Sequence, residues 1–200
     1  MQKSKYKNWP IVLEYAESIR DGKKVACPEL RQAVDRFFQD LENPEYEMTY
    51  RDPEFCIQII EKTICHQQGE RLDGTPLRGE PFTLEPFHKF IIYNLVGFKH
   101  KGTEILRFHE ALIFIPRKNI KTSFAAALAW ALSLLYRRSG AKTYIASAAL
   151  MQSLESFNFL QYNVDRMGEN QKNGGNIKVI DNNNEHSLEA SFEDGYSYIR

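Results

Sequence analysis

The sequence predicts an α/β protein in which a parallel sheet covered by helices follows a helical N-terminal region. Apolar residues recur at helical spacing between residues 8 and 80. Further along, a short β-branched run at residues 111–115 precedes a longer apolar run at 124–135, the order of a buried strand and a buried helix. Short apolar runs separated by turn residues at 177–199 are typical of strands joined by tight turns.

Three helices are expected in the N-terminal region, because each apolar pattern has its own start signal. Pro10 and Pro28 suit a first helical turn, and Asp52 is a capping residue ahead of the third pattern. Gly22 ends the first pattern, and Gly69 is the residue expected just after the third helix.

A loop rich in glycine, proline and charge separates this region from the rest of the chain. It covers residues 71–81 and is the expected domain boundary. The chain is therefore predicted to contain a helical N-terminal region, residues 1–80, and a second domain, residues 81–200.

The second domain is expected to contain two neighbouring parallel strands joined by a buried crossover helix. The two strands are predicted at residues 111–115 and 144–146, and the helix between them at 122–137. Another helix is predicted at 149–164 and ends before Gly168. Three further strands are predicted at residues 177–180, 187–192 and 196–199.

Composition excludes some classes of function. Apolar residues make up 42% of the 200 residues, and 26 basic residues balance 26 acidic ones. Zero net charge argues against a strongly basic coat for nucleic acid, although a local basic patch remains compatible with it. No apolar run has the length of a membrane span, and the N-terminus lacks the apolar centre of a signal peptide. Cys27, Cys56 and Cys65 have no metal-ligand spacing, so reducing cytoplasm is the expected compartment.

The chemistry of the second domain is concentrated between its first predicted strand and the helix that follows. A basic turn, Pro116-Arg117-Lys118-Asn119, leads to Lys121-Thr122 at the predicted start of the helix. This is the layout of a phosphate-binding loop. Backbone N–H groups and the helix N-terminus face the anion, the lysine meets the outer phosphates, and the threonine hydroxyl binds Mg²⁺.

The glycines of the usual phosphate-loop pattern are absent. G-x-x-x-x-G-K-[ST] places them at positions 115 and 120, where this chain has Ile115 and Ile120. Glycine normally supplies unusual backbone angles and close approach to phosphate at such positions. A surface turn capped by Thr122 is therefore the alternative interpretation of these residues.

The turn and the helix start resemble a motif of one viral family. Pro116-Arg117-Lys118-Asn119-x-Lys121-Thr122 is similar to the deviant Walker A motif of tailed-bacteriophage terminase large subunits, which usually reads P-R-K-N-G-K-S. In that family the first glycine is routinely absent and basic residues fill the turn, whereas Ile120 departs from the pattern. The resemblance implies an incomplete parallel sheet of the P-loop NTPase type, with ATP and Mg²⁺ as cofactors.

The resemblance also implies a role for each loop residue. Lys121 would hold the β- and γ-phosphates, Thr122 would bind Mg²⁺, and Arg117 would be the catalytic group that stabilises transition-state charge in cis. The loop residues expected to hold the nucleotide are Arg117, Lys118, Asn119, Ile120, Lys121, Thr122 and Ser123.

Two further segments resemble nucleotide-contacting segments of the same family. Phe82 to His88 is similar to the family's F-x-L-x-P-W-Q, whose aromatic residue packs on adenine and whose amide contacts the base edge. Phe82, Phe87 and His88 are thus expected at adenine; the alternative is a helix start with an aromatic staple. Gln152 matches the family's strand-tip glutamine and would sense the γ-phosphate side, although a solvated helix glutamine fits equally well.

Hydrolysis would require an apolar run ending in Asp-Glu, and the sequence after residue 148 contains none. In terminases that motif and a nuclease domain lie further along the chain, so a truncated N-terminal ATPase region is expected. Complete members package double-stranded viral DNA into procapsids in the host cytoplasm, with a portal protein, a small terminase subunit and a homo-oligomeric ring, and without a membrane. The alternatives are a non-catalytic assembly or binding module with a vestigial loop, and a helicase-like ATPase that remodels nucleic acid.

Overall fold

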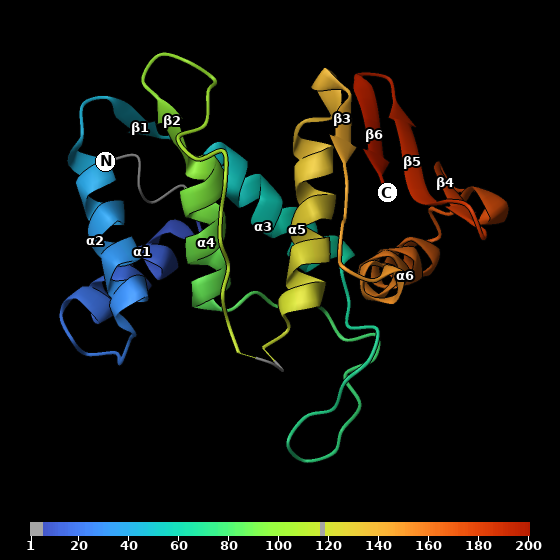
Figure 1. Cartoon of the computed structure of the whole chain (residues 1–200), viewed down its shortest axis with the longest axis horizontal. Helices are drawn as coiled ribbons and strands as arrows, with labels where there is room; N and C mark the ends of the chain where they lie inside the picture. The colour runs from blue at the N-terminus through green and yellow to red at the C-terminus, as the bar shows by residue number, and fades with distance from the viewer. Residues whose placement is uncertain (1–5, 117–118) are drawn as a thin grey trace. The chain divides into compact units, whose positions relative to one another are not determined.

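A computed structural model describes residues 6–116 and 119–200 and divides the chain into two compact units (Figure 1). Unit 1 consists of Met1–Ile57 and Leu84–Phe114, and unit 2 of Gln58–Thr83 and Ile115–Arg200. The predicted boundary after residue 80 stays a prediction, and the chain passes between the units after Ile57, Thr83 and Phe114. Each unit is described by itself below.

Unit 1 is built from helices, which are α1 (Trp9–Arg20), α2 (Pro28–Glu42), the first half of α3 (Arg51–Thr63) and α4 (Pro86–Gly97). Of these, α1 and α2 have the predicted prolines in their first turns; Asp52 lies inside α3 and not ahead of it as a cap. Gly69 was expected just after α3, but this prediction is wrong because α3 ends at Thr63 and the chain continues there as a loop.

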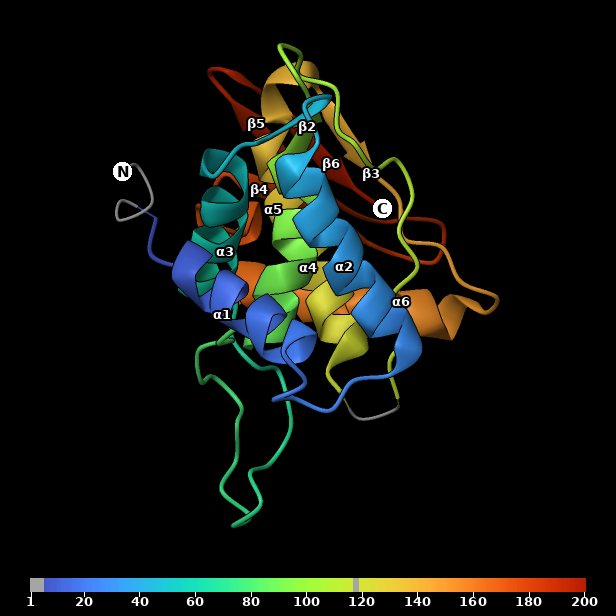
Figure 2. The same cartoon turned by 90° about the vertical axis from the view of Figure 1, so that its left-hand side faces the viewer.

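Aromatic side chains form the core of unit 1 where α1, α2 and α4 pack side by side (Figure 2). The ring of Phe37 on α2 is fully buried and lies 6.0 Å from Trp9, 5.2 Å from Phe90 and 5.8 Å from Phe98. Phe98 begins β2 (Phe98–His100), which pairs antiparallel with β1 (Tyr46–Met48). The small sheet thus continues directly from the end of α4.

A network of buried polar groups surrounds Glu54 inside unit 1. The Glu54 carboxylate accepts hydrogen bonds from the backbone and side-chain nitrogens of Asn8 at 2.7 and 2.8 Å, and from the Tyr93 hydroxyl at 2.7 Å. Lys89 Nζ donates to Asn8 Oδ1 at 2.8 Å. Because buried polar groups are costly only when unpaired, this network ties α1, α3 and α4 together.

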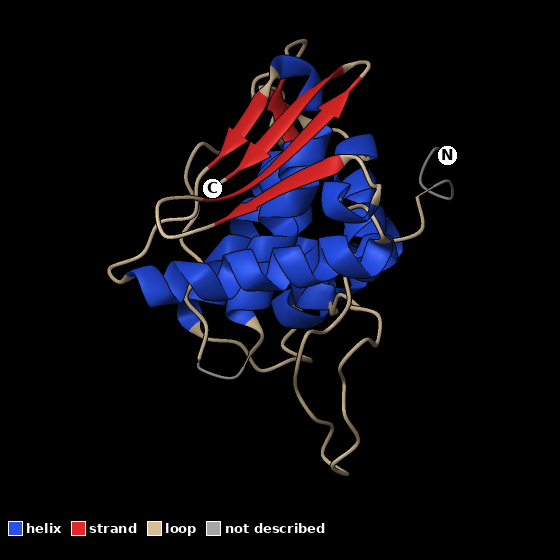
Figure 3. Cartoon of the chain, turned by 90° about the vertical axis from the view of Figure 1, so that its right-hand side faces the viewer, coloured by secondary structure: helices blue, strands red, loops and turns tan. Residues whose placement is uncertain are grey.

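Unit 2 contains two long helices and a mixed four-stranded sheet. The helices are α5 (Lys121–Leu135) and α6 (Leu150–Met167), with short 3₁₀ turns η2 (Arg137–Ser139) and η3 (Gln171–Asn173). The strands, shown side by side in Figure 3, are β3 (Ala141–Thr143), β4 (Ile177–Asp181), β5 (His186–Phe192) and β6 (Gly195–Ile199). Their order is β3-β6-β5-β4.

The sheet is mixed and not wholly parallel as predicted. Only β3 and β6 run parallel, whereas β6, β5 and β4 form an antiparallel meander. The tight turns expected between the strands at 177–199 join these three strands, since hairpin turns connect antiparallel neighbours. The α/β class is therefore confirmed, and the parallel arrangement is corrected.

The predicted strand pair of residues 111–115 and 144–146 is wrong. Residues 111–115 form no strand, and Leu112 and Phe114 are 92% and 93% exposed. The first strand after α5 is β3, which ends at Thr143 and takes β6 as its parallel partner. An apolar run becomes a strand only where another backbone pairs with it, and sequence periodicity does not contain that information.

The helix predicted at residues 122–137 is confirmed as α5, but it is not a crossover between parallel strands, because neither predicted strand forms. Its C-terminal end is held by the β5–β6 turn. Arg137 makes two hydrogen bonds of 2.9 Å to the Asp194 carboxylate, which Arg138 contacts at 3.2 Å. A Cβ atom on Gly195 would lie 2.2 Å from the Arg137 carbonyl oxygen, so glycine permits this close approach. Gly140 then reverses the chain into β3 with φ of 70°.

Residues 66–80, here called the arm, form a narrow hairpin-like projection from unit 2 that extends beyond α5 and α6 (Figure 1). Its root is fixed on α6 by the buried amide of Asn163. The amide oxygen accepts from Cys65 N at 2.7 Å, and the amide nitrogen donates to Cys65 O at 3.2 Å. Arg166 donates to the Gly79 carbonyl at 3.2 Å, so both strands of the arm are held at the same end of the helix.

Candidate phosphate-binding loop

The segment that the sequence identifies as a phosphate-binding loop has one unusual backbone residue. Ile120, the N-cap of α5, has φ of 56° and ψ of 20°, in the left-handed region. Among the described residues it is the only non-glycine residue with positive φ. A β-branched residue is strongly disfavoured there, because its Cβ crowds the carbonyl oxygen that follows. The chain therefore adopts a glycine-type turn at the position where the Walker A pattern has its second glycine.

Backbone donors at the start of α5 are left without a side-chain cap. Ile120 has no polar side-chain atom to accept from them, and the first turn contains no acidic residue. The first N–H groups of a helix have no partner within the helix, and together with the helix dipole they favour an anion. Lys121, Thr122 and Ser123 occupy this turn, and Lys121 and Thr122 are exposed.

Lys121 is directed across the loop and not along the helix. Its Nζ atom donates to the Ile115 carbonyl oxygen at 3.3 Å, so the ammonium group spans the loop from its end to its beginning. The Asn119 amide donates to the Pro116 carbonyl at 3.3 Å, which tightens the same turn. The loop is thus closed by its own side chains, with a positive charge at its mouth. Arg117 and Lys118, expected to be catalytic and nucleotide-binding residues, lie outside the described residues.

The donor set suits a nucleoside triphosphate with Mg²⁺. Helix N–H groups and an ammonium group are the usual partners of phosphate oxygens, and a threonine hydroxyl is a usual ligand of the accompanying Mg²⁺. Within the described ranges no group of three or more His, Cys, Asp or Glu side chains could hold a metal ion. Thr122 would therefore be this loop's own contribution to a Mg²⁺ that arrives with the nucleotide.

Phe82, expected at adenine, is part of the core of unit 2. It is 1% exposed, and its ring lies 4.9 Å from the ring of His66 and 6.1 Å from that of Phe159 on α6. A base could reach its face only after this packing opened. The structure thus gives Phe82 a role at the root of the arm, and its contact with adenine stays a prediction.

Phe87 and His88 belong to unit 1 and form the start of α4. His88 Nδ1 accepts a hydrogen bond from the backbone N of Glu85 at 3.2 Å, and the Glu85 carboxylate accepts from the backbone of His88 in return. This is a capping box with histidine in the place of the usual Glu or Gln. Burial lowers the pKa of His88 to about 4, so the ring is neutral at physiological pH, as an acceptor at Nδ1 must be.

Gln152 is exposed in the first turn of α6, close to an apolar hollow that the sequence did not indicate. The hollow has a volume of about 450 Å³ and lies beyond the end of β3. Its lining includes Tyr144, Leu150, Leu154, Phe157 and Ile199. Tyr144 and Leu150 are 66% and 62% exposed, and no sequence signal separates such side chains from core residues of the same type.

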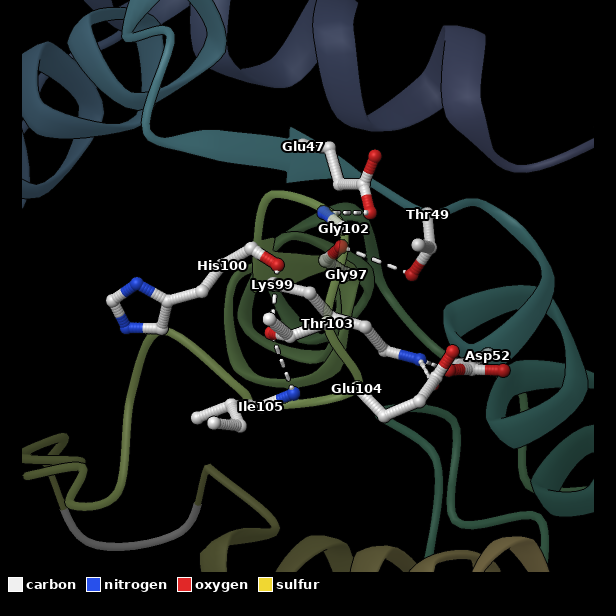
Figure 4. A network of polar contacts seen from close by, with 10 residues as sticks. All are labelled: Glu47, Thr49, Asp52, Gly97, Lys99, His100, Gly102, Thr103, Glu104 and Ile105. Carbon is white, nitrogen blue, oxygen red and sulfur yellow. Dashed lines mark hydrogen bonds and ion pairs between the residues drawn. The ribbon is translucent and has the colours of Figure 1, made fainter.

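A charged cluster in unit 1 is structural and not catalytic (Figure 4). Lys99 Nζ lies 2.7 Å from Asp52 and 2.6 Å from Glu104, and its side chain is 9% exposed. Burial alone would lower the pKa of Lys99, but hydrogen bonds to the two carboxylates outweigh it and raise the pKa. A lysine that keeps its proton in this way cannot act as a nucleophile or base. It holds the turn after β2 against the start of α3.

Comparison with protein-family models, with curated proteins and with solved structures finds no match. No helix within the described parts of the chain is long and apolar enough to cross a membrane. The geometry of the loop and of its surroundings therefore carries the functional argument.

Proposed function

We propose that this chain is the N-terminal ATPase portion of a tailed-bacteriophage terminase large subunit, in which residues 115–123 bind Mg·ATP. The observation that supports this most strongly is the backbone of Ile120. Strained backbone is kept where the surroundings impose it, and such residues cluster at ligand-binding sites. Here the strain lies one residue before Lys121, at the place where a phosphate loop requires a left-handed turn.

In this proposal each group of the loop has its own role. The N–H groups at the start of α5 and the Lys121 ammonium hold the β- and γ-phosphates, and the Thr122 hydroxyl binds Mg²⁺. Arg117 stabilises charge on the transferring phosphoryl group. In the complete protein this site would drive packaging of double-stranded viral DNA with the portal protein and the small subunit.

A binding module without turnover is the second candidate function. It is favoured by the side chain of Ile120, which is 43% exposed on the loop where phosphate must approach the backbone closely. The two candidates differ in hydrolysis and agree in predicting anion binding at the same loop.

Isothermal titration with Mg·ATP tests the shared part of the proposal. We expect Lys121→Ala to weaken binding by about tenfold or more, because the ammonium pairs with charged oxygens in a partly dehydrated loop. Lys142→Ala is the matched control, since Lys142 is an exposed lysine on β3 of the same unit. Equal affinity of the two variants, or no ATP binding by the unmodified chain, would contradict the proposal.

A second variant tests whether the Ile120 side chain obstructs the approach of phosphate. Ile120→Gly gives the loop the G-K-T sequence and removes the side chain from the approach to the phosphates. We expect it to bind Mg·ATP at least as tightly as the unmodified chain. Because the Asp-Glu run that hydrolysis requires is absent from this sequence, phosphate release should stay at the background rate in both proteins. Release well above background that depends on Lys121 would reveal a catalytic carboxylate within these residues and would rule out the binding module without turnover.

A further inference from the structure

One asparagine of unit 2 is followed directly by glycine, in the loop between α6 and β4. Asn173-Gly174 is the single Asn-Gly pair of the sequence, and both residues are exposed. The side-chain amide of an asparagine can be attacked by the backbone nitrogen of the next residue, and a side chain on that residue crowds the attack. Glycine has no Cβ atom and obstructs it least. This pair is therefore the place in the chain where such a reaction meets the smallest steric barrier.

The reaction is an exchange at the side-chain carbonyl carbon of Asn173. The Gly174 nitrogen loses its proton and bonds to that carbon, the bond from the carbon to the amide nitrogen breaks, and the amide nitrogen leaves as ammonia. Water then opens the cyclic imide at either of its carbonyl carbons. The product is aspartate, or isoaspartate, in which the main chain passes through the former side-chain carbon. Both products add a negative charge at position 173.

Hydrogen bonds within the turn η3 restrain the attacking nitrogen. The turn is held by backbone bonds from Asn173 N to Asn170 O at 2.8 Å, from Gly174 N to Gln171 O at 3.1 Å and from Gly175 N to Asn170 O at 3.0 Å. The Gly174 N–H is thus a donor inside the turn. Loss of its proton, which the reaction requires, would also remove this hydrogen bond.

The backbone angles of η3 oppose ring closure as well. Residues in a 3₁₀-helix have ψ of about −20 to −30°. A ring through the Gly174 nitrogen requires the Cα–Cβ bond of Asn173 to lie nearly eclipsed with its peptide C–N bond, and a helical ψ keeps these two bonds apart. The turn must therefore open before the nitrogen can reach the carbonyl carbon.

A buried amide attaches this turn to α6. The side chain of Asn170 is 5% exposed, its nitrogen donates to the Asp165 carboxylate, and its oxygen accepts from Lys172 N at 3.1 Å. Opening of η3 breaks the bond to Lys172. The contacts of Asn170 therefore help to set the fraction of time that the turn is open, as local contacts do for any local opening.

We propose that Asn173 is a deamidation site and that the turn η3 controls the rate of the reaction. The rate in the folded chain is the rate of the open segment multiplied by the fraction of time that the segment is open. Isoaspartate lengthens the main chain by one carbon atom, so the N–H groups of Gly174 and Gly175 no longer match their acceptors in the turn. The proposal is independent of nucleotide binding, because it involves no residue of the loop 115–123.

Peptide mass spectrometry of the whole chain after incubation at physiological pH tests the site. Residue 173 should gain the mass difference between an amide and a carboxylic acid. The exposed residues Asn158, Asn176 and Asn184, each followed by a residue with a side chain, should stay unmodified over the same time. Enzymatic methylation of isoaspartate should label the modified chain, because only the cyclic imide leads to this product. No change at residue 173, or aspartate without isoaspartate, would overturn the proposal.

A comparison of rates tests the control by the turn. The chain unfolded in guanidinium chloride should deamidate at Asn173 about tenfold faster or more than the folded chain, because no turn restrains it. Asn170→Ala should accelerate the reaction in the folded chain by removing the contacts to Asp165 and Lys172. Asn158→Ala, an exposed change on α6, is the matched control and should leave the rate unchanged. Equal rates in the folded and unfolded chains, or no acceleration by Asn170→Ala, would overturn the control by η3.

Discussion

The helices α4 and α5 are alike in sequence character and different at their N-termini. Both are apolar nearly all round, and each contributes a run of buried side chains to its own unit. α4 starts with Pro86 behind a capping box made by Glu85 and His88. α5 follows Ile120, whose backbone lies in the left-handed region and whose side chain makes no capping hydrogen bond.

This difference shows how the same local structure can serve stability or binding. At α4 the orphan N–H groups are paired within the chain, and the helix start is a finished structural element. At α5 the described N-cap residue provides no side-chain acceptor for them, and a strained residue lies directly before them. We therefore expect substitutions at the start of α4 to lower stability. Substitutions at the start of α5 should weaken ligand binding with little effect on stability.

The largest expected effect is at His88. His88→Ala should lower the free energy of unfolding by about 2–4 kcal/mol, because it removes a buried ring and leaves the Glu85 N–H without its acceptor. Thr122→Ala at the start of α5 should change it by less than about 0.5 kcal/mol, as an exposed substitution does. Urea denaturation of both variants measures the difference, and similar losses would contradict the comparison.

A pH titration of stability isolates the charge state of His88. Its pKa is about 4 in the folded chain and 6.5 when unfolded, so the unfolded chain binds more protons between these values. Stability from the neutral ring is therefore full above pH 6.5 and is lost as pH falls towards 4. We expect a loss of about 2 kcal/mol between pH 6.5 and 5. In His88→Gln, whose amide does not titrate, denaturation midpoints should be nearly flat over that range; an equal slope would assign the effect to other groups.

A smaller effect is expected from the other half of the capping box. Glu85→Ala should lower the free energy of unfolding by about 1 kcal/mol, the usual value of a helix cap. Glu85→Asp provides the control because it keeps an acceptor on a capping residue. If thermal denaturation gives the same midpoint for Glu85→Ala and the unmodified chain, the capping box does not contribute in solution.

The smallest expected effect has the opposite sign. Ile120→Gly should raise the free energy of unfolding by about 0.5–1 kcal/mol, because relief of the left-handed strain exceeds the entropy that glycine adds to the unfolded chain. Ile113→Gly, in a segment without regular structure nearby, should show no such gain. Destabilisation by Ile120→Gly would mean that the isoleucine side chain contributes more than the backbone strain costs.

Local signals in the sequence predicted most helices and missed part of the sheet. Pro28 marks the start of α2 and Gly168 the end of α6 correctly, because their effects depend on their own backbone. The partner of β3 could not be predicted, since pairing with β6 joins residues far apart in the chain. At the candidate site the motif located Lys121 at the helix start, but neither the strain at Ile120 nor the capping role of His88 was visible. Both depend on backbone geometry that residue identity does not reveal.

The amide of Asn163 has a mechanical consequence for the arm. It bonds to both the N–H and the C=O of Cys65, and a further bond of 2.9 Å joins it to the Phe159 carbonyl on its own helix. By bonding to both backbone groups of Cys65, the Asn163 amide makes the contacts that a neighbouring strand would make at the root of the arm. The root of the arm is therefore attached to α6 through the backbone of Cys65, and a displacement of this end of the helix would carry the root with it.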